Sequence, residues 1–225
     1  NPREPWAWDH LWSPFGSPDD SGRTIGRVIG FTIFSVLLLA PFNWVSFFSG
    51  EERVAFKVLT GAFDLMIVCT GAWAVYLIAR RRKYGVGVLR FRQFPFLTGG
   101  EVEVVLPRGG PLAQLESLEA TLRCVQERYE TQRRGGKSES RVVCYEVWSE
   151  TRRSDAGDGR QSTGREFTWR FMVPESAPGT SLSERPPRYW ELEVKAEMPG
   201  VDYRATFLVP VYEDARRERA ARLAG

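Results

Sequence analysis

Side chains that could do acid–base or nucleophilic chemistry are sparse in this sequence and poorly spaced for it. The one histidine, His10, lies in a Pro-, Gly- and Ser-containing leader, where no rigid element is expected to hold a general base. The carboxylate pairs Glu101/Glu103 and Glu191/Glu193 lie two residues apart on expected strands, so each pair shares one face. That face alternates with an apolar one and is the expected solvated side. We therefore expect no catalytic residues.

Metal, cofactor and nucleic-acid sites lack their usual signals as well. The sequence has no phosphate-binding loop, dinucleotide fingerprint, zinc-protease helix or serine-hydrolase elbow. Cys69, Cys124 and Cys144 form no CxxC pair or Cys/His cluster, and Cys124 and Cys144 are expected to stay reduced in a cytoplasmic domain. The net charge of +3 is too small to indicate nucleic-acid binding. The expectation is a non-enzymatic protein without cofactor, metal, nucleic-acid partner or small-molecule substrate.

Two long apolar segments dominate the first third of the chain. Residues 28–48 carry no charge, and residues 58–79 carry only Asp64. At ~1.5 Å of rise per residue, a helix of either length spans the ~30 Å hydrocarbon core of a bilayer. The charged stretch between them is short enough to be a turn outside the membrane. The sequence therefore predicts a transmembrane helical hairpin over residues 28–79, preceded by a Trp-containing arm over residues 1–27.

Basic residues beside these segments predict the orientation of the hairpin. A block of four, Arg80, Arg81, Arg82 and Lys83, follows the second segment directly, whereas the connecting turn balances two basic residues with two glutamates. By the positive-inside rule, the arm and the large C-terminal region face the cytoplasm of a bacterial inner membrane. The block serves as an orientation signal at the level of the lipid headgroups, and it could also hold anionic lipid.

Candidate docking residues lie in the arm and in the two apolar segments. A carboxylate about two turns inside a membrane segment, such as Asp64, is costly unless it meets protein or water, so it is a functional candidate by default. The alternative is that Asp64 turns to the interface or bonds the other helix of its own hairpin. Tryptophans near a span usually rest among lipid headgroups, and the alternative for the arm is contact with a neighbouring protein. The candidates for partner docking are Asp64, Trp6, Trp8, Trp12, Trp44 and Trp73.

Short alternating segments after the basic block predict an antiparallel β domain over residues 84–212. The clearest are residues 101–105, 141–148, 167–173, 189–198 and 203–211. Residues 112–129 are ambiguous, because leucines at three- and four-residue spacing favour a helix while alternation from Leu118 to Cys124 favours a strand. Polar stretches at 133–140 and 151–164 are expected to be loops, and residues 213–225 a surface helix. Trp169 and Trp190 are expected in the core.

A set of motifs in this order resembles an uncharacterised bacterial membrane family with a transmembrane hairpin followed by an arrestin-like or immunoglobulin-like β-sandwich. The motifs are Pro5-Trp6, Gly99-Gly100, Leu122-Arg123-Cys124, Val147-Trp148, residues 171–174 (FMVP), 190–194 (WELEV), 199–203 (PGVDY) and 207–211 (FLVPV). The resemblance covers nearly the whole chain. It implies an all-β sandwich in which the segment around Cys124 is a strand, and it implies no catalytic residues.

Two functions remain open from the sequence. The first is an accessory or scaffold subunit, whose hairpin packs against other transmembrane subunits and whose sandwich docks on a larger complex of respiratory or photosynthetic type. The second is a free-standing membrane-anchored sensor or adaptor, whose sandwich binds a peptide or lipid. The polar loops and sheet edges offer surfaces for either role.

Overall fold

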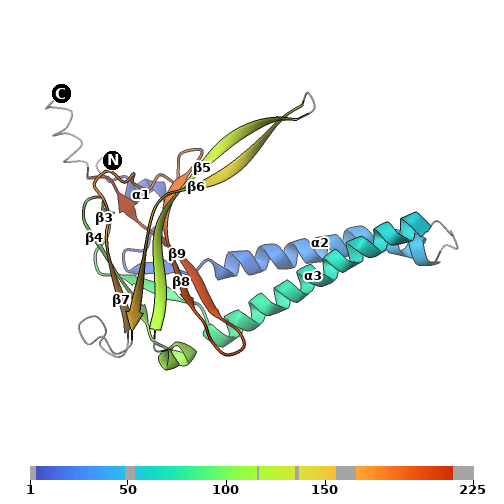
Figure 1. Ribbon diagram of the computed structural model, residues 1–225, viewed down its shortest axis with the longest axis horizontal. Coiled ribbons are helices and arrows are strands. Elements are labelled where there is room, and N and C mark those ends of the chain that lie inside the picture. The colour runs from blue at the N-terminus through green and yellow to red at the C-terminus, as the bar shows by residue number, and fades with distance from the viewer. Residues whose placement is uncertain (1–3, 49–53, 116, 135–136, 156–165, 215–225) are drawn as a thin grey trace. The chain divides into compact units, whose positions relative to one another are not determined.

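The protein consists of two compact units, an all-β unit and a helical unit (Figure 1). The computed structural model describes residues 4–48, 54–115, 117–134, 137–155 and 166–214. The β unit comprises the described residues up to 19 and from 86 onward, and the helical unit comprises those between 20 and 85. Of the tail predicted to be a helix, residues 215–225 lie outside the described residues, as do residues 49–53 of the turn between the apolar segments.

The helical unit contains α2 (Ser21–Phe48) and α3 (Val54–Tyr84), and both are long and apolar enough to cross a membrane. Each helix extends beyond the apolar segment that predicted it. The first helix starts at Ser21, so residues 21–27, several of them polar, form helical turns before the charge-free segment. The second helix continues through the basic block, whose cations interact favourably with the negative carboxyl-terminal end of the helix dipole.

The β unit begins with a short helix, α1 (Trp6–Asp9), and contains three sheets. The first is ordered β1-β2-β4-β7 (Gly16–Pro18, Val88–Phe91, Glu101–Pro107, Glu166–Met172). The second is ordered β6-β5-β8-β9 (Lys137–Asp155, Ser117–Arg134, Arg188–Ala196, Tyr203–Val209). A parallel pair joins β3 (Phe96–Leu97) to β10 (Val211–Tyr212), and a 3-10 turn, η1 (Gly110–Gln114), precedes β5. Both four-stranded sheets are antiparallel throughout.

Alternating apolar side chains build the core of the β unit. Leu118, Ala120, Leu122 and Cys124 of β5 are buried, and their neighbours Glu119 and Thr121 are not. The strand interpretation of this segment is therefore confirmed, and the helical periodicity is misleading. Trp169 of β7 and Trp190 of β8 are 1% and 0% exposed, which confirms the expectation that both lie in the core.

Two predicted loops are wrong in their described parts. Within 133–140, β5 runs to Arg134 and β6 resumes at Lys137, and within 151–164, β6 continues to Asp155. Residues 135–136 and 156–164 lie outside the described residues. These segments lack the apolar alternation that marks a half-buried strand, but polar side chains pair across the two strands instead, as in the 2.9 Å contact between the hydroxyl oxygens of Thr121 and Thr151. The described part of β6 thereby reaches 19 residues.

The two helices are inserted between two paired strands of the β unit. The chain leaves β1 after Pro18 and returns in β2 at Val88, and these two residues lie opposite each other in the antiparallel pair. Asp19 and Gly87 extend this pairing, since Asp19 N–H donates to Gly87 O at 3.0 Å and Gly87 N–H donates to the Asp19 carboxylate at 3.2 Å. Gly16 is required in β1 because a Cβ there would lie 2.1 Å from Leu89 O. Both connections to the helical unit therefore leave from the same end of one strand pair.

Candidate functional site

The side chains that α2 and α3 bury are mostly small or polar. Ser35 and Ser46 of α2 and Thr60, Ala74 and Leu77 of α3 are buried, and of these only Leu77 is large and apolar. Most large apolar side chains of both helices, such as Leu37 and Val68, are exposed. Small and hydroxyl-bearing residues let transmembrane helices approach closely. In water this pattern would leave the helices without a hydrophobic reason to associate, whereas it is the expected pattern when lipid surrounds them.

Asp64, the predicted docking carboxylate, has its partner inside the hairpin. The Asn43 side-chain amide donates a hydrogen bond of 2.8 Å to Asp64 Oδ1. The second reading of Asp64, a bond to the other helix of its own hairpin, is therefore the one that the structure supports. Asn43 was missed as a site residue, and its signal was available, because it is the only side-chain amide within residues 28–48. Asn43 Oδ1 and Ser46 Oγ are buried without a hydrogen-bond partner among the described residues.

The tryptophans of the two helices differ from those of the arm. Trp44 and Trp73 are exposed, and each stacks on an aromatic neighbour of its own helix, Phe48 and Tyr76 respectively, with ring centroids 5.1 and 5.4 Å apart. They remain available to lipid or to a partner helix.

In the arm, Trp6 and Trp12 face the β unit. Trp6 packs edge-on against Tyr212 with ring centroids 6.0 Å apart, and Trp12 Nε1 donates to the Tyr212 hydroxyl at 2.7 Å. Both rings thus contact Tyr212 of β10, a contact within the protein that neither interpretation of the arm predicted. Trp8, by contrast, is exposed.

Asp9 fixes the arm to the β unit. Its carboxylate accepts hydrogen bonds from the backbone N–H groups of Leu182 and Ser183, at 3.1 and 2.7 Å, and from the Tyr212 hydroxyl at 3.0 Å. Burial alone would raise the pKa of Asp9, but these donors outweigh it and hold the pKa below its ordinary value. Burial of the Tyr212 hydroxyl raises its pKa, so this hydroxyl remains a donor.

The basic block closes α3. Arg81, Arg82 and Lys83 occupy the last turn of the helix, and the Lys83 ammonium lies 5.0 Å from the centre of the Tyr84 ring. Arg80 belongs to the preceding turn. These positions are compatible with the predicted place of the block at the headgroup level.

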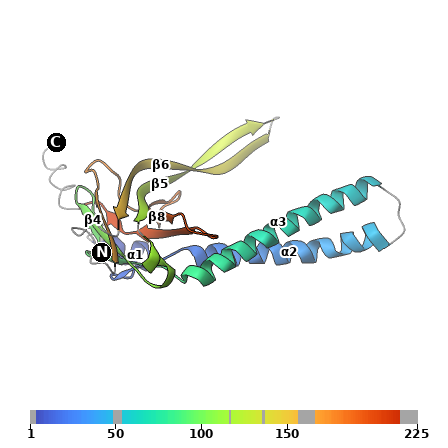
Figure 2. The same cartoon turned by 60° about the horizontal axis from the view of Figure 1, so that its bottom comes forward.

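A two-stranded extension of β5 and β6 projects from the rest of the β unit in both views (Figures 1 and 2). We call residues 126–134 and 137–145 the distal ribbon. The last residue of β5 paired with β8 is Gln126, and Glu127 N–H still donates to Pro187 O at 3.0 Å. Past Glu127, the described residues of β5 and β6 pair only with each other. On one face of the ribbon, side chains interact across the two strands: the Arg128 guanidinium lies 5.4 Å from the Tyr145 ring centre, and the Tyr145 hydroxyl donates to Glu130.

The other face of the distal ribbon presents apolar side chains to solvent. Tyr129 and Val142 lie opposite each other there and are 55% and 51% exposed. Cys144, exposed as well, lies two residues further along β6 on the same face, opposite Glu127. Sequence analysis missed this face because it assigned residues 133–140 to a loop and left residues 112–129 ambiguous between helix and strand.

A charged network covers the polar face of β5, β8 and β9. Glu193 is only 4% exposed and contacts Lys195 Nζ at 2.9 Å and the Arg204 guanidinium. Burial raises the pKa of Glu193, but these two cations outweigh that effect and lower it. Arg123 Nε bonds Glu191 at 2.6 Å. The carboxylates that sequence reasoning assigned to a solvated face are therefore paired with cations, and this pairing explains why Glu193 can be buried.

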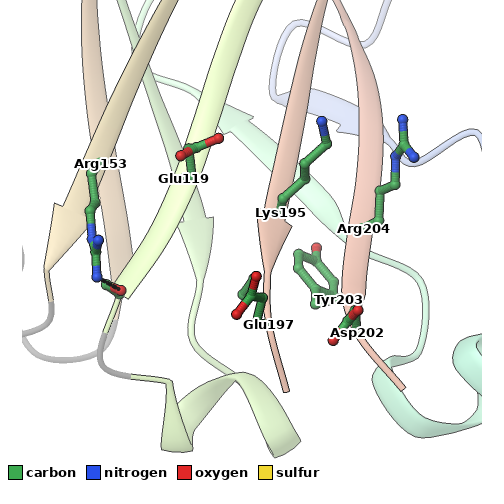
Figure 3. Close-up of a pocket in the computed structure, with 9 residues that line it drawn as sticks. Glu119, Arg153, Lys195, Glu197, Asp202, Tyr203 and Arg204 are labelled. Carbon is green, nitrogen blue, oxygen red and sulfur yellow. Dashed lines mark hydrogen bonds between the residues drawn. The ribbon is translucent and has the colours of Figure 1, made fainter. Parts of the chain in front are cut away.

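One end of this face forms an open polar cavity of about 590 Å³ (Figure 3). Neighbouring strands place Arg153, Glu119, Lys195 and Arg204 in one row across its wall. Glu197, Asp202 and Tyr203 complete the part of the lining labelled in Figure 3. Among the described residues, no group of three or more His, Cys, Asp and Glu side chains is arranged to hold a metal ion. The cavity can bind a polar, charged group by hydrogen bonds and ion pairs.

Comparisons with known proteins give little beyond the geometry. No family model matches the chain, and no curated protein matches it. Among solved structures, it is similar to the sporulation control protein Spo0M from Bacillus subtilis, with 13% sequence identity and a TM-score of 0.32. The match covers 55% of this chain and 47% of that protein, so the chain spans about half the length of the structure it matches.

Proposed function

We propose that the protein is a non-enzymatic accessory subunit, anchored by its helical hairpin in the bacterial inner membrane and docked on a larger membrane complex. In this proposal α2 and α3 span the bilayer, and the arm and the β unit face the cytoplasm. The pairing of β1 with β2 supports a common side for the arm and the β unit, since both connections to the helices leave from one strand pair. The basic block after α3 favours the cytoplasm as that side.

We further propose that the two four-stranded sheets close into an arrestin-like or immunoglobulin-like sandwich. The burial of alternate residues along β4 of one sheet and β9 of the other supports this, because each sheet then has one apolar face to cover. A sandwich of this kind provides a rigid base for the distal ribbon.

The observation that carries the docking role is the exposed apolar face of the distal ribbon. A two-stranded ribbon in water is marginally stable by itself. Exposure of both Tyr129 and Val142 adds an unfavourable hydration free energy that a partner surface would remove. Nothing in the described residues of the chain covers this face, and a bound subunit would.

Extraction of the tagged protein from its own membrane in mild detergent tests this function. We expect partner proteins at near-equal stoichiometry, identified by mass spectrometry. The Tyr129→Ser/Val142→Ser variant should lose most of them, whereas the control variant Val147→Ser/Met172→Ser, which removes exposed apolar side chains elsewhere, should retain them. A wild-type protein that is extracted alone contradicts the proposal.

The polar cavity of Figure 3 favours a second candidate, a membrane-anchored adaptor that binds a charged peptide. Its lining carries three cations, Arg153, Lys195 and Arg204, and the carboxylates Glu119, Glu197 and Asp202, which suits a peptide with both acidic and basic side chains. This role predicts transient partners whose binding weakens with salt and is reduced by Lys195→Gln but not by Tyr129→Ser. The opposite pattern favours the accessory subunit.

A further inference from the structure

A shallow groove of about 390 Å³ lies on the outer face of the sheet that carries β1 and β2. Phe15 and Val88 form an apolar part of its lining and are 83% and 48% exposed. Val105 lies between the core residues Val104 and Leu106 in the strand, so its side chain is on the outer face of the sheet. It forms part of the groove lining, although it is only 2% exposed. The groove is thus a hollow with an apolar lining on a sheet face that would ordinarily be polar.

Two arginines flank the same groove. Arg90 and Arg92 share one carboxylate, Glu166, with N–O distances of 3.4 and 3.7 Å. Both guanidinium-bearing side chains remain about 60% exposed, at 61% and 59%. Two cations and one anion leave a net positive charge beside an exposed phenylalanine. Guanidinium groups bind phosphate oxygens through paired hydrogen bonds, so they can accept an anionic group in addition to Glu166.

Chain connectivity ties this groove to the ends of the two helices. Pro18 of β1 comes three residues before the start of α2 at Ser21, and Val88 of β2 comes four residues after the end of α3 at Tyr84. An extended chain covers at most ~3.6 Å per residue, so Pro18 and Val88 lie within roughly 15 Å of the helix ends. If the helices span the bilayer, the end of the groove at Val88 is therefore held near the headgroup layer on the side of the basic block.

We propose that this groove binds the headgroup of an anionic phospholipid from the bilayer that holds the hairpin. The phosphate group pairs with Arg90 and Arg92, and the glycerol region lies against Phe15 and Val88. An exposed apolar side chain next to cations is the combination that favours the interface of an anionic membrane over water. The β unit is thereby held on the membrane surface, and its rotation about the two connections to the helices is restricted. This inference rests on the membrane anchoring in the proposed function.

Nitroxide accessibility in nanodiscs tests the inference with the full chain. Exposed Cys69 and Cys144 are replaced, and single labels are placed at Val88, at Leu37 in α2 and at Ser149 on the other four-stranded sheet. In discs of phosphatidylcholine with phosphatidylglycerol, we expect the label at 88 to be shielded from an aqueous nickel reagent and the label at 149 to be accessible. The shielding at 88 should weaken in pure phosphatidylcholine.

Charge variants separate the groove from a general basic attraction. Arg90→Gln/Arg92→Gln should make the label at 88 as accessible to nickel as the label at 149. It should also lower the phosphatidylglycerol retained in native mass spectra on the order of tenfold. The control Arg152→Gln/Arg185→Gln removes the same charge from exposed positions outside both the groove and the polar cavity and should change neither readout.

The label at Leu37 distinguishes two kinds of failure. If it contacts lipid while the label at 88 is as nickel-accessible as that at 149 in both discs, the hairpin is in the membrane and the groove inference is wrong. An equal loss of shielding at 88 in the Arg152→Gln/Arg185→Gln control also contradicts the inference about the groove. If the label at 37 is itself accessible to nickel, the membrane anchoring of the proposed function is wrong, and this inference fails with it.

Discussion

The helical unit and the β unit place their polar and apolar side chains in opposite ways. In the β unit, tryptophans such as Trp190 are buried and charged side chains cover the sheet face. In the helical unit, Ser35, Ser46 and the Asn43–Asp64 pair lie between the helices, and large side chains such as Leu37 point outward. Burial of apolar surface is favourable in water and gains nothing in hydrocarbon, so the second arrangement is the one expected of helices that span a bilayer, as proposed for this hairpin. The change between the two arrangements falls near residues 20 and 85, where the two units meet along the chain.

The largest expected effect comes from the core of the β unit. Trp190→Ala removes a fully buried ring whose Nε1 donates to Pro178 O at 2.9 Å, so we expect the free energy of unfolding to fall by about 3–5 kcal/mol. The same change at exposed Trp44 should lower it by under about 1 kcal/mol. Chemical denaturation of both variants, followed by near-ultraviolet circular dichroism, measures the difference. Equal losses would contradict the contrast between the units.

A charge on the outer face of α2 gives the next largest effect. Leu37→Arg places a guanidinium near the centre of the predicted span, and we expect a penalty of about 3 kcal/mol on membrane insertion. Val142→Arg in the β unit replaces a side chain of similar exposure and should leave insertion unchanged. A glycosylation-based insertion assay reports both variants. Normal insertion of Leu37→Arg would show that this face does not meet lipid.

The Asn43–Asp64 pair should have a smaller effect. Asp64→Leu leaves the Asn43 amide unsatisfied, and we expect a loss of about 1 kcal/mol in hairpin stability. The double variant Asn43→Leu/Asp64→Leu should lose less than the sum of the single changes. A double-mutant cycle on thermal unfolding in detergent measures the coupling. Additive losses would mean that the hydrogen bond contributes nothing, and assembly with partner subunits should then be examined for Asp64→Leu on native gels.

Protonation of Asp9 at low pH should weaken the attachment of the arm to the β unit, and we expect it to lower the free energy of unfolding by no more than the Asp64→Leu change does. Because the folded pKa of Asp9 is lowered, its contribution to stability is present above the ordinary value of about 3.9 and is lost as the pH falls through the folded pKa. Asp9→Asn should remove this pH dependence and lower stability at pH 7 by about 1 kcal/mol. Thermal midpoints at pH 7 and pH 3.5 test both statements. An unchanged acid dependence in Asp9→Asn would assign it to other carboxylates.

The sequence predicts elements well where one periodicity dominates. Residues 101–105 and 203–211 alternate cleanly and are strands, and the charge-free run at 28–48 is helical. The distal ribbon could not be predicted in the same way. Its strands are stabilised by side-chain pairs such as Arg128 with Tyr145 and Glu130 with Tyr145. The contribution of these pairs to stability depends on the register of the two strands and not on hydrophobicity.

The candidate sites show the same limit. Asp64 is conspicuous in the sequence because a charge in an apolar run is rare, but its bond to Asn43 depends on how two helices align. Tyr212 offers no signal at all, since its role requires Trp6, Asp9 and Trp12 from the opposite end of the chain. Contacts between segments that are distant in the chain depend on the tertiary structure and leave no pattern in the local sequence.

The insertion of both helices between β1 and β2 also sets an order of events during synthesis. β1 leaves the ribosome early, but its partner strand is translated only after α2, the turn and α3. A nascent chain that ends before Val88 therefore lacks the strand with which β1 pairs. The hydrogen bond between Asp9 and the Tyr212 hydroxyl can form only later, once Tyr212 has been translated. If the hairpin spans the membrane as proposed, its insertion can precede completion of the sheet, and a strand made before the hairpin is fixed in place only after it.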